Sequence, residues 1–254
     1  MSAPAPAPTA FTWEPLFLAL AVAAAVLYAR AARRERVPLW RVGAFAGGLF
    51  LIAAALNSPL ETLAADYLLV MHLLQNVVIA DWAPPLLVLG LTPRMRAEIT
   101  RVGGRALETV TRPRVALPAW LVGWYAIHFA GFYDAALANP WLLNVEHALL
   151  IAIGLVFWWP VIVGRLSPPV AIAYLGAGFV GSAFLGLALT FATSVLYDYY
   201  ETVPRIWGLS ALEDQNYGGV LMSAEQAAIF LVAIGWFLLA LLREEEAGGQ
   251  PARR

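Results

Sequence analysis

The stretch Asp66–Gly90, DYLLVMHLLQNVVIADWAPPLLVLG, is long and apolar enough to cross a lipid bilayer. It nevertheless carries four polar side chains, His72, Gln75, Asn76 and Asp81. Polar groups are costly in lipid, and a membrane helix that keeps them usually turns them toward the protein interior at a functional site. The stretch therefore predicts a membrane-spanning helix with a functional face.

The whole chain has the composition of an integral membrane protein. Of its 254 residues, 61% are hydrophobic and 13% are charged, and the mean hydropathy is +0.71, whereas soluble proteins are about 45–50% apolar. The absence of Cys excludes disulfides and thiolate ligands, so soft-metal chemistry would depend on His and Met. All 16 basic residues are Arg, and the absence of Lys excludes a retinal Schiff base. The net charge of −1 gives no indication of a nucleic-acid partner.

Apolar stretches of about 20 residues predict an all-α polytopic membrane bundle of seven transmembrane helices. They cover residues 15–31, 39–56, 66–91, 116–134, 142–163, 170–193 and 223–242. We expect a single membrane domain over residues 1–254, with an N-terminal tail at 1–13 and a C-terminal tail at 243–254. The Pro84-Pro85 pair predicts a kink in the third span. Small residues four apart in the sixth span predict close helix packing, and they are Gly178, Ser182, Gly186 and Thr190.

The connection at residues 194–222 is rich in Tyr, Trp and acidic residues. It contains the pair Gly218-Gly219, which we interpret as a turn. This composition indicates either a segment packed over the helix ends or an aromatic belt at the membrane interface.

The distribution of arginine predicts the topology, because basic connections stay in the cytoplasm. Fifteen of the 16 arginines fall in the connections after the first, third, fifth and seventh spans, leaving only Arg205 on the other side. They are Arg30, Arg33, Arg34, Arg36, Arg41, Arg94, Arg96, Arg101, Arg105, Arg112, Arg114, Arg165, Arg243, Arg253 and Arg254. The opposite connections carry the acidic residues Glu61, Asp66, Asp134, Asp198, Glu201, Glu213 and Asp214. We therefore expect the N-terminus outside and the C-terminus in the cytoplasm.

The only three histidines fall on three successive spans at similar depth. His72 lies about 9 Å below the outer end of the third span. His128 lies about one and a half turns before the outer end of the fourth span. His147, preceded by Glu146, lies about two turns after Asn139-Pro140, which is typical of a helix start. Matching depth on neighbouring spans predicts that the three imidazoles converge.

Imidazole ligands suit copper, zinc and iron, and methionine thioethers shift the preference to Cu(I). The sequence therefore predicts an outer-side metal site, with copper as the cofactor, formed by His72, His128 and His147. Further candidates are Met71, Asn76 and Met222. The alternative for each histidine is a core imidazole that hydrogen-bonds a neighbour.

Three more polar side chains are site candidates. Gln75 shares a helical face with His72, and Glu146 adjoins His147. Asp81 lies nine residues beyond His72, on the opposite face and about 22 Å below Asp66. We expect Asp81 to be protonated, to bond groups freed by the proline kink, or to face a polar partner.

Four blocks occur in a diagnostic order: HLLQN with APPLLVLG, WYAIHFAGFYDAAL, EHALLIAIGLVFWWPV and IWGLSALEDQNYGGVLM. From about residue 40 to 242 the chain thereby resembles the CtaG-type cytochrome c oxidase assembly factors of bacteria. Asn76 stands where the family pattern has a second His, and MSAEQ stands where the family tends to show Met-Trp. The resemblance also marks the Asp-Gln pair, Asp214 and Gln215, as a site candidate.

The resemblance implies a non-enzymatic assembly factor in the bacterial plasma membrane, with oxidase subunits or other assembly factors as partners. Two other classes stay open. A transporter of a metal, a proton or a small solute would use Asp81 and the kinked third span. A haem-binding membrane protein would use two of the histidines as axial ligands.

Overall fold

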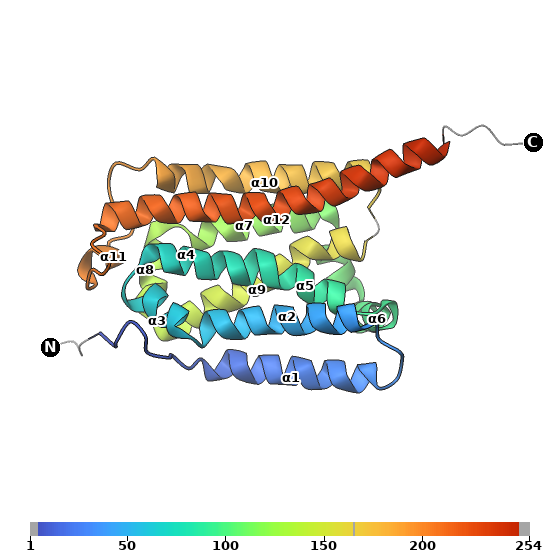
Figure 1. Cartoon of the computed structure of the whole chain (residues 1–254), viewed down its shortest axis with the longest axis horizontal. Helices are drawn as coiled ribbons and strands as arrows, with labels where there is room; N and C mark the ends of the chain where they lie inside the picture. The colour runs from blue at the N-terminus through green and yellow to red at the C-terminus, as the bar shows by residue number, and fades with distance from the viewer. Residues whose placement is uncertain (1–4, 165, 249–254) are drawn as a thin grey trace, which may run out of the picture.

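The computed structural model describes residues 5–164 and 166–248, and every element in these ranges is a helix (Figure 1). The helices are α1 (Pro15–Ala32), α2 (Leu39–Leu56), α3 (Pro59–Asp66), α4 (Leu69–Val77), the π-helical turn η1 (Val78–Trp82), α5 (Ala83–Gly90), α6 (Pro93–Val110), α7 (Pro113–Ile127), α8 (Ala130–Leu137), α9 (Pro140–Ile162), α10 (Pro168–Thr190), α11 (Tyr199–Thr202) and α12 (Ala211–Gly248). Residues 1–4 and 249–254 of the expected tails, including Arg253 and Arg254, lie outside the described residues, as does Arg165.

The expected all-α membrane bundle is confirmed. Within the described ranges, six helical segments are long and apolar enough to cross a membrane. A seventh span results if α7 and α8 are counted as one segment, although they meet at a bend of 65°. The expected fourth span at 116–134 is thus a bent pair of helices, and His128 lies at the bend. Which end of the bundle faces the cytoplasm stays a prediction.

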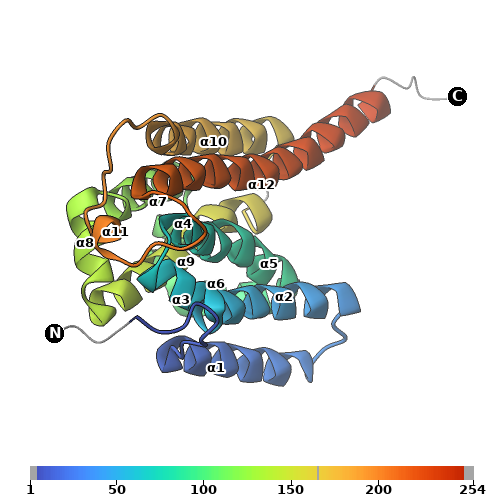
Figure 2. The same ribbon diagram turned by 60° about the vertical axis from the view of Figure 1, so that its left-hand side comes forward.

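The bundle has two different ends (Figure 1). The described chain starts beside α3, α8 and α11 at one end, while the connection from α1 to α2 and helix α6 lie at the other. Helix α1 lies at the margin and packs mainly on α2, as Figure 2 also shows. The span Leu69–Gly90 is the most enclosed, with 67% of its residues buried against 6% for α1. The stretch with the polar side chains is therefore the centre of the fold.

Aromatic rings fill the middle of the bundle. The Trp120 ring of α7 lies 4.6 Å from the Phe157 ring of α9 and 5.8 Å from the Phe230 ring of α12, measured between centroids. Trp124 stacks on Trp120 one turn further along α7. Such contacts contribute about 0.5–1.5 kcal/mol per pair beyond the burial of area, and here they tie three spans together.

The third span is interrupted where the sequence predicts a kink. Pro84 and Pro85 have no backbone N–H to donate to the preceding turn, and the helix passes through the π-helical turn η1 just before them. The carbonyl group of Ala80 in η1 lies against Gly154 of α9, where an added Cβ atom would be 2.1 Å from the carbonyl oxygen. Glycine at position 154 is therefore required for α9 to approach the broken span.

The interpretation of Gly218-Gly219 as a turn is wrong. Both glycines lie inside α12, which begins at Ala211 rather than near residue 223. A Cβ atom on Gly219 would lie 2.5 Å from the Thr190 nitrogen and 2.7 Å from the Gly186 oxygen of α10. Close packing of α12 on α10 requires the small residue at 219, and Gly218 faces Leu73 and Val70 of α4 instead. These contacts outweigh the poor helix propensity of glycine, about 1 kcal/mol per residue.

We expect Gly219→Ala to destabilise the protein by about 1–3 kcal/mol, because the new methyl group meets backbone atoms that can move only with α10. Gly235→Ala, in the same helix with no atom within 4 Å of its added Cβ, is the matched control. The control should be neutral or slightly stabilising. Thermal unfolding of both purified variants in detergent tests this, and equal melting temperatures would contradict the packing explanation.

Candidate functional site

The three histidines lie together near the α3, α8 and α11 end of the bundle. We define the histidine cluster as His72, Asn76, His128, Tyr133, Glu146, His147 and Tyr200, contributed by α4, the bend between α7 and α8, α8 itself, α9 and α11. All seven side chains are buried, and none is more than 4% exposed. Five separate segments of the chain thus enclose one polar region.

His72 is held in one orientation by Tyr200. The Tyr200 hydroxyl donates to the Ala64 carbonyl at 2.6 Å, so it accepts from His72 Nδ1 at 3.0 Å. This network assigns a proton to Nδ1. In a neutral ring, Nε2 therefore keeps a lone pair, and it lies 3.4 Å from Glu146 Oε1. Nε2 is suited either to an imidazolium paired with this carboxylate or to a cation bound beside it.

Glu146 is the only acidic side chain among these seven residues. Its Oε1 atom accepts a hydrogen bond from Asn76 Nδ2 at 3.1 Å and faces His72. Asn76 and His72 are one turn apart on α4, so a single carboxylate oxygen reaches both. The side-chain amide at position 76 therefore positions Glu146 toward His72.

His147 lies beside His72, and Tyr133 lies near both His72 and His128. The ring centroid of His147 is 6.0 Å from that of His72, in an edge-on arrangement. The ring of Tyr133 lies 4.9 Å from His72 and 5.7 Å from His128. The Nδ1 atom of His128 is 2.8 Å from the Trp124 carbonyl oxygen, which can only accept, so Nδ1 carries the proton and Nε2 keeps the lone pair.

Several buried polar atoms of the histidine cluster have no hydrogen-bond partner among the described residues. They are the Nε2 atoms of all three histidines, Oδ1 of Asn76, Oε2 of Glu146 and the Tyr133 hydroxyl. Buried polar groups are normally paired, and such exceptions occur where an ion, a water or a ligand binds. In the residues that the structure describes, no group of three or more His, Asp or Glu side chains is arranged to hold a metal ion. One ion bound by all three histidines would therefore require the side chains to turn.

Asp214 fixes the start of the helix that carries His72. Its two carboxylate oxygens accept from the backbone N–H groups of Leu69 and Val70, both at 2.9 Å, and it pairs with Arg205 at 3.1 Å. An acidic group at a helix N-terminus satisfies free N–H groups and complements the helix dipole. The next residue, Gln215, bonds the backbone of Leu196 and Ser194 instead. Both members of the Asp-Gln pair thus shape the region around the histidines without entering it.

Gln75 lies outside the histidine cluster and bonds residues of α2 and α3. Its amide nitrogen donates to the Ala55 carbonyl and to the Glu61 carboxylate. Glu61, which the sequence places in a connection between spans, has a buried side chain that is only 2% exposed. Glu61 lies on the short helix α3, which packs against α4 and α2.

The two methionine candidates lie in different surroundings. Met71 packs in a separate apolar cluster with Tyr67, Leu68 and Val70. Met222 is fully buried in the main core on α12. Neither makes a polar contact with the histidine cluster among the interactions that the structure describes.

Asp81 forms a second buried polar contact, distinct from the histidine cluster. Of the three alternatives given by the sequence, the structure gives it a polar partner, since Gln226 Nε2 of α12 donates to its Oδ2 at 3.2 Å. Asp81 Oδ1 and Gln226 Oε1 have no partner in the described part of the chain. The contact joins η1 to α12.

Sequence analysis missed Tyr133, Tyr200, Glu61 and Gln226. Ser58-Pro59 with Glu61 three residues after the Ser is a helix-start signal that could have indicated α3. Tyr200 is one of several tyrosines in a connection, and nothing local distinguishes it. Gln226 has no signal that relates it to Asp81.

A sequence model of the family described as cytochrome c oxidase caa3 assembly factor (Caa3_CtaG) matches residues 22–244. The match includes His72, His128 and His147, together with both ends of the bundle. Comparison with curated proteins and with solved structures finds no match.

Glu61 gives a testable pH dependence. Burial raises the pKa of its carboxyl from 4.5 to about 7, so the folded chain keeps a proton that the unfolded chain releases. Stability should therefore fall as pH rises from about 5 to 7, by at most about 3 kcal/mol, and level off above that range. Glu61→Gln should flatten this slope, whereas Glu108→Gln, on the exposed face of α6, should leave it unchanged. Melting temperatures measured across this pH range would refute the assignment if Glu61→Gln and the parent had equal slopes.

Proposed function

The chain belongs to the cytochrome c oxidase caa3 assembly factor family, and from this premise we propose that it handles copper at the histidine cluster while a haem–copper oxidase is assembled. The protein acts in a bacterial plasma membrane, with the histidine cluster on the outer side, and its partners are oxidase subunits or other assembly factors. Copper is its cargo, and the chain performs no catalysis.

The observation that carries the proposal is the set of buried, unpartnered imidazole nitrogens. His72 and His128 each use Nδ1–H in a hydrogen bond to an oxygen, which leaves Nε2 as the open donor atom. Metal-binding histidines usually have this pattern, because the second bond fixes the tautomer and the ring orientation. In this proposal Tyr200 and the Trp124 carbonyl are the orienting partners.

His72 and His147 are the pair best suited to hold an ion first. Their rings are neighbours, and a metal between two imidazole nitrogens needs bonds of only about 2 Å. Glu146 supplies a negative charge that compensates a cation in this buried site. His128, across Tyr133, offers the third nitrogen after a change of ring orientation.

Asn76 makes copper binding weaker than in a chain with a second histidine there. An amide oxygen is a hard, neutral donor and a poor partner for Cu(I), whereas His at position 76 would present a second imidazole one turn from His72. The amide of Asn76 instead bonds Glu146. We therefore infer a site of reduced affinity that uses His72, His128 and His147.

We expect purified protein to bind Cu(I) at a single site, and His72→Ala and His147→Ala each to reduce affinity at least about tenfold, because each removes one nitrogen ligand. Asp81→Asn, at the buried contact with Gln226, is the matched control and should bind like the parent. Asn76→His should bind more tightly than the parent. Competition with a Cu(I)-specific chelator measures all of these affinities.

The copper proposal fails if neither the parent nor Asn76→His binds Cu(I). Binding by Asn76→His alone would mean that this chain has lost the site. Binding that survives alanine at all three histidines would assign copper to other residues. An optical spectrum of the parent as purified tests the haem alternative, because a strong Soret band would favour axial histidine ligands.

We expect deletion of the gene to lower cytochrome c oxidase activity and oxidase copper content while other membrane proteins persist. The parent gene should restore both, and the Asp81→Asn gene should do so equally. The gene with alanine at the three histidines should not, although its product is inserted at normal levels. Full restoration by the triple variant would separate the assembly role from the histidines.

A further inference from the structure

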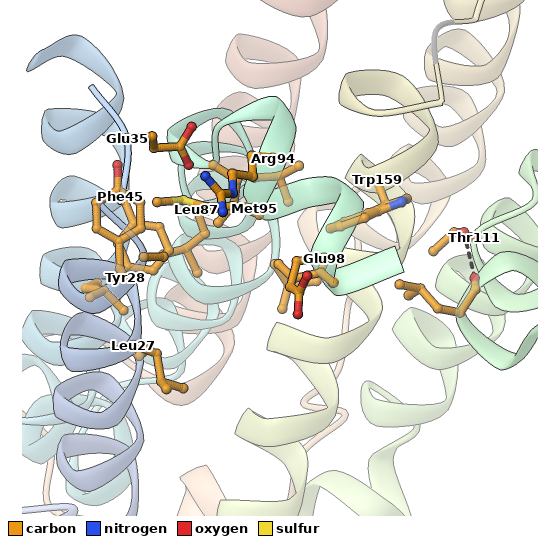
Figure 3. A pocket seen from close by; sticks show the side chains of 18 of the residues that line it. Leu27, Tyr28, Glu35, Phe45, Leu87, Arg94, Met95, Glu98, Thr111 and Trp159 are labelled. Atoms are coloured by element: carbon orange, nitrogen blue, oxygen red, sulfur yellow. Dashed lines mark hydrogen bonds between the residues drawn. The ribbon is translucent and has the colours of Figure 1, made fainter. Parts of the chain in front are cut away.

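A large cavity lies beside α6, and none of the histidine-cluster residues lines it (Figure 3). Its volume is about 620 Å³, within the range of small-molecule sites. Five helices form its walls: α1, α2, α5, α6 and α9. Most wall residues are apolar, including Leu27, Phe45, Leu87, Leu155 and Trp159. The cavity thus suits a long hydrocarbon group.

Four of the side chains that line this cavity are charged. They are Arg34, Glu35, Arg94 and Glu98. Glu35 accepts a hydrogen bond from Thr92 at 2.7 Å, and Glu98 pairs with Arg101 at 2.6 Å. Neither Arg34 nor Arg94 forms an ion pair with a carboxylate in the part of the chain that the structure describes. Glu35 and Glu98 thus each have a polar partner, while the Arg94 guanidinium donates to the Arg34 carbonyl at 3.4 Å and keeps further N–H groups for an anion, as does Arg34.

The surrounding connections add to this positive charge. Residues 30–41 and 92–114 together hold eleven arginines and three glutamates, Glu35, Glu98 and Glu108. The Arg101 guanidinium lowers the pKa of Glu98, and Arg34 and Arg94 contribute in the same direction. An anion beside Arg34 and Arg94 is therefore favoured by its wider surroundings as well as by these two side chains.

We propose that the cavity binds one anionic phospholipid, with an acyl chain along the apolar wall and its phosphate beside Arg34 and Arg94. Guanidinium groups bind phosphate oxygens through charge-assisted hydrogen bonds. The ligand matches the two features of the site, an apolar wall and two arginines that form no ion pair with a carboxylate in the described part of the chain. A free phosphate would leave the apolar wall unused.

Helix α6 closes the cavity on its arginine-rich side. Met95 and Ile99 lie one turn apart on its face toward the cavity, and Leu107 and Thr111 extend the lining further along the chain. Arg101 and Arg105 lie exposed on the same helix. The backbone of α6 bends at Gly104, where φ is 51°. A segment with such apolar and basic side chains is typical of the membrane interface among anionic lipids.

A bound lipid would strengthen the attachment of α1. Helix α1 packs mainly on α2, and its polar tie to α5 is a bond of 3.1 Å from the Tyr28 hydroxyl to the Gly90 carbonyl. An acyl chain in the cavity would contact α1, α5 and α9 at once. A lipid that binds the folded chain but not the unfolded chain raises the stability of the folded state by mass action.

The test uses delipidated protein in detergent with phosphatidylglycerol or phosphatidylcholine added at equal concentrations. Native mass spectrometry counts tightly bound lipid, and thermal unfolding measures stabilisation. We expect one tightly bound phosphatidylglycerol and a larger rise in melting temperature than with phosphatidylcholine. The double variant Arg34→Gln/Arg94→Gln should lower the phosphatidylglycerol affinity about tenfold. The control Arg105→Gln/Arg114→Gln removes two exposed arginines that do not line the cavity and should behave like the parent.

A second pair of variants tests the interior. Ala24→Trp fills part of the cavity and should abolish the tightly bound lipid, whereas Ala23→Trp, on the exposed face of α1, should not. Far-UV circular dichroism verifies that each variant is folded. Equal stabilisation by the two lipids, or equal loss of binding in the two arginine pairs, would overturn the proposed phosphate contact. Undiminished binding by folded Ala24→Trp would overturn the proposed cavity.

Discussion

The contact of Asp214 with the start of α4 is the constraint on which the geometry of the histidine cluster depends. Its carboxylate accepts from Leu69 and Val70, residues that are 145 and 144 positions away in the chain. Buried N–H groups at a helix start would otherwise be left without partners, at a cost of about 1–3 kcal/mol each. Arg205 pairs with Asp214 and donates to the Tyr200 carbonyl at 3.1 Å. The same ion pair therefore fixes both His72 on its helix and the segment that carries the hydroxyl bonded to it.

The sequence predicts the features that depend on nearby residues, and it does not predict contacts between distant helices. Hydropathy identifies the long spans, because lipid demands about 20 apolar residues whatever they contact. Asn139 was predictable as a helix cap, since its side chain accepts from the nearby Trp141 backbone N–H. The partners of Asp81 and Asp214 were not, because each lies on a distant helix and several buried arrangements would satisfy either carboxylate. The bend at His128 likewise depends on the neighbours of α7 and α8.

Two segments show how packing overrides local preference. Gly218-Gly219 has the composition of a turn, yet both residues lie inside α12, where Gly218 packs against α4 and Gly219 against α10 too closely for larger side chains. Glu61 has the charge of a surface residue, yet α3 packs against α4, so that Glu61 is buried and accepts a hydrogen bond from Gln75. In each case a contact with another helix decides the local structure or the burial of the residue. Neither contact produces a pattern of apolar residues from which it could be predicted.

The π-helical turn η1 explains how one span can serve two different ends of the molecule. One residue added to a helix rotates every later side chain by about 100° around the axis. Before this turn, α4 directs His72 and Asn76 toward Glu146 of α9. After it, α5 contributes Leu87 and Val88 to the cavity beside α1. In a continuous α-helix, Leu87 and Val88 would point in a different direction relative to His72 and Asn76, and they would not line the cavity as they do now. The break before Pro84, accommodated by Gly154, therefore separates a polar half of the span from an apolar half that faces another neighbour.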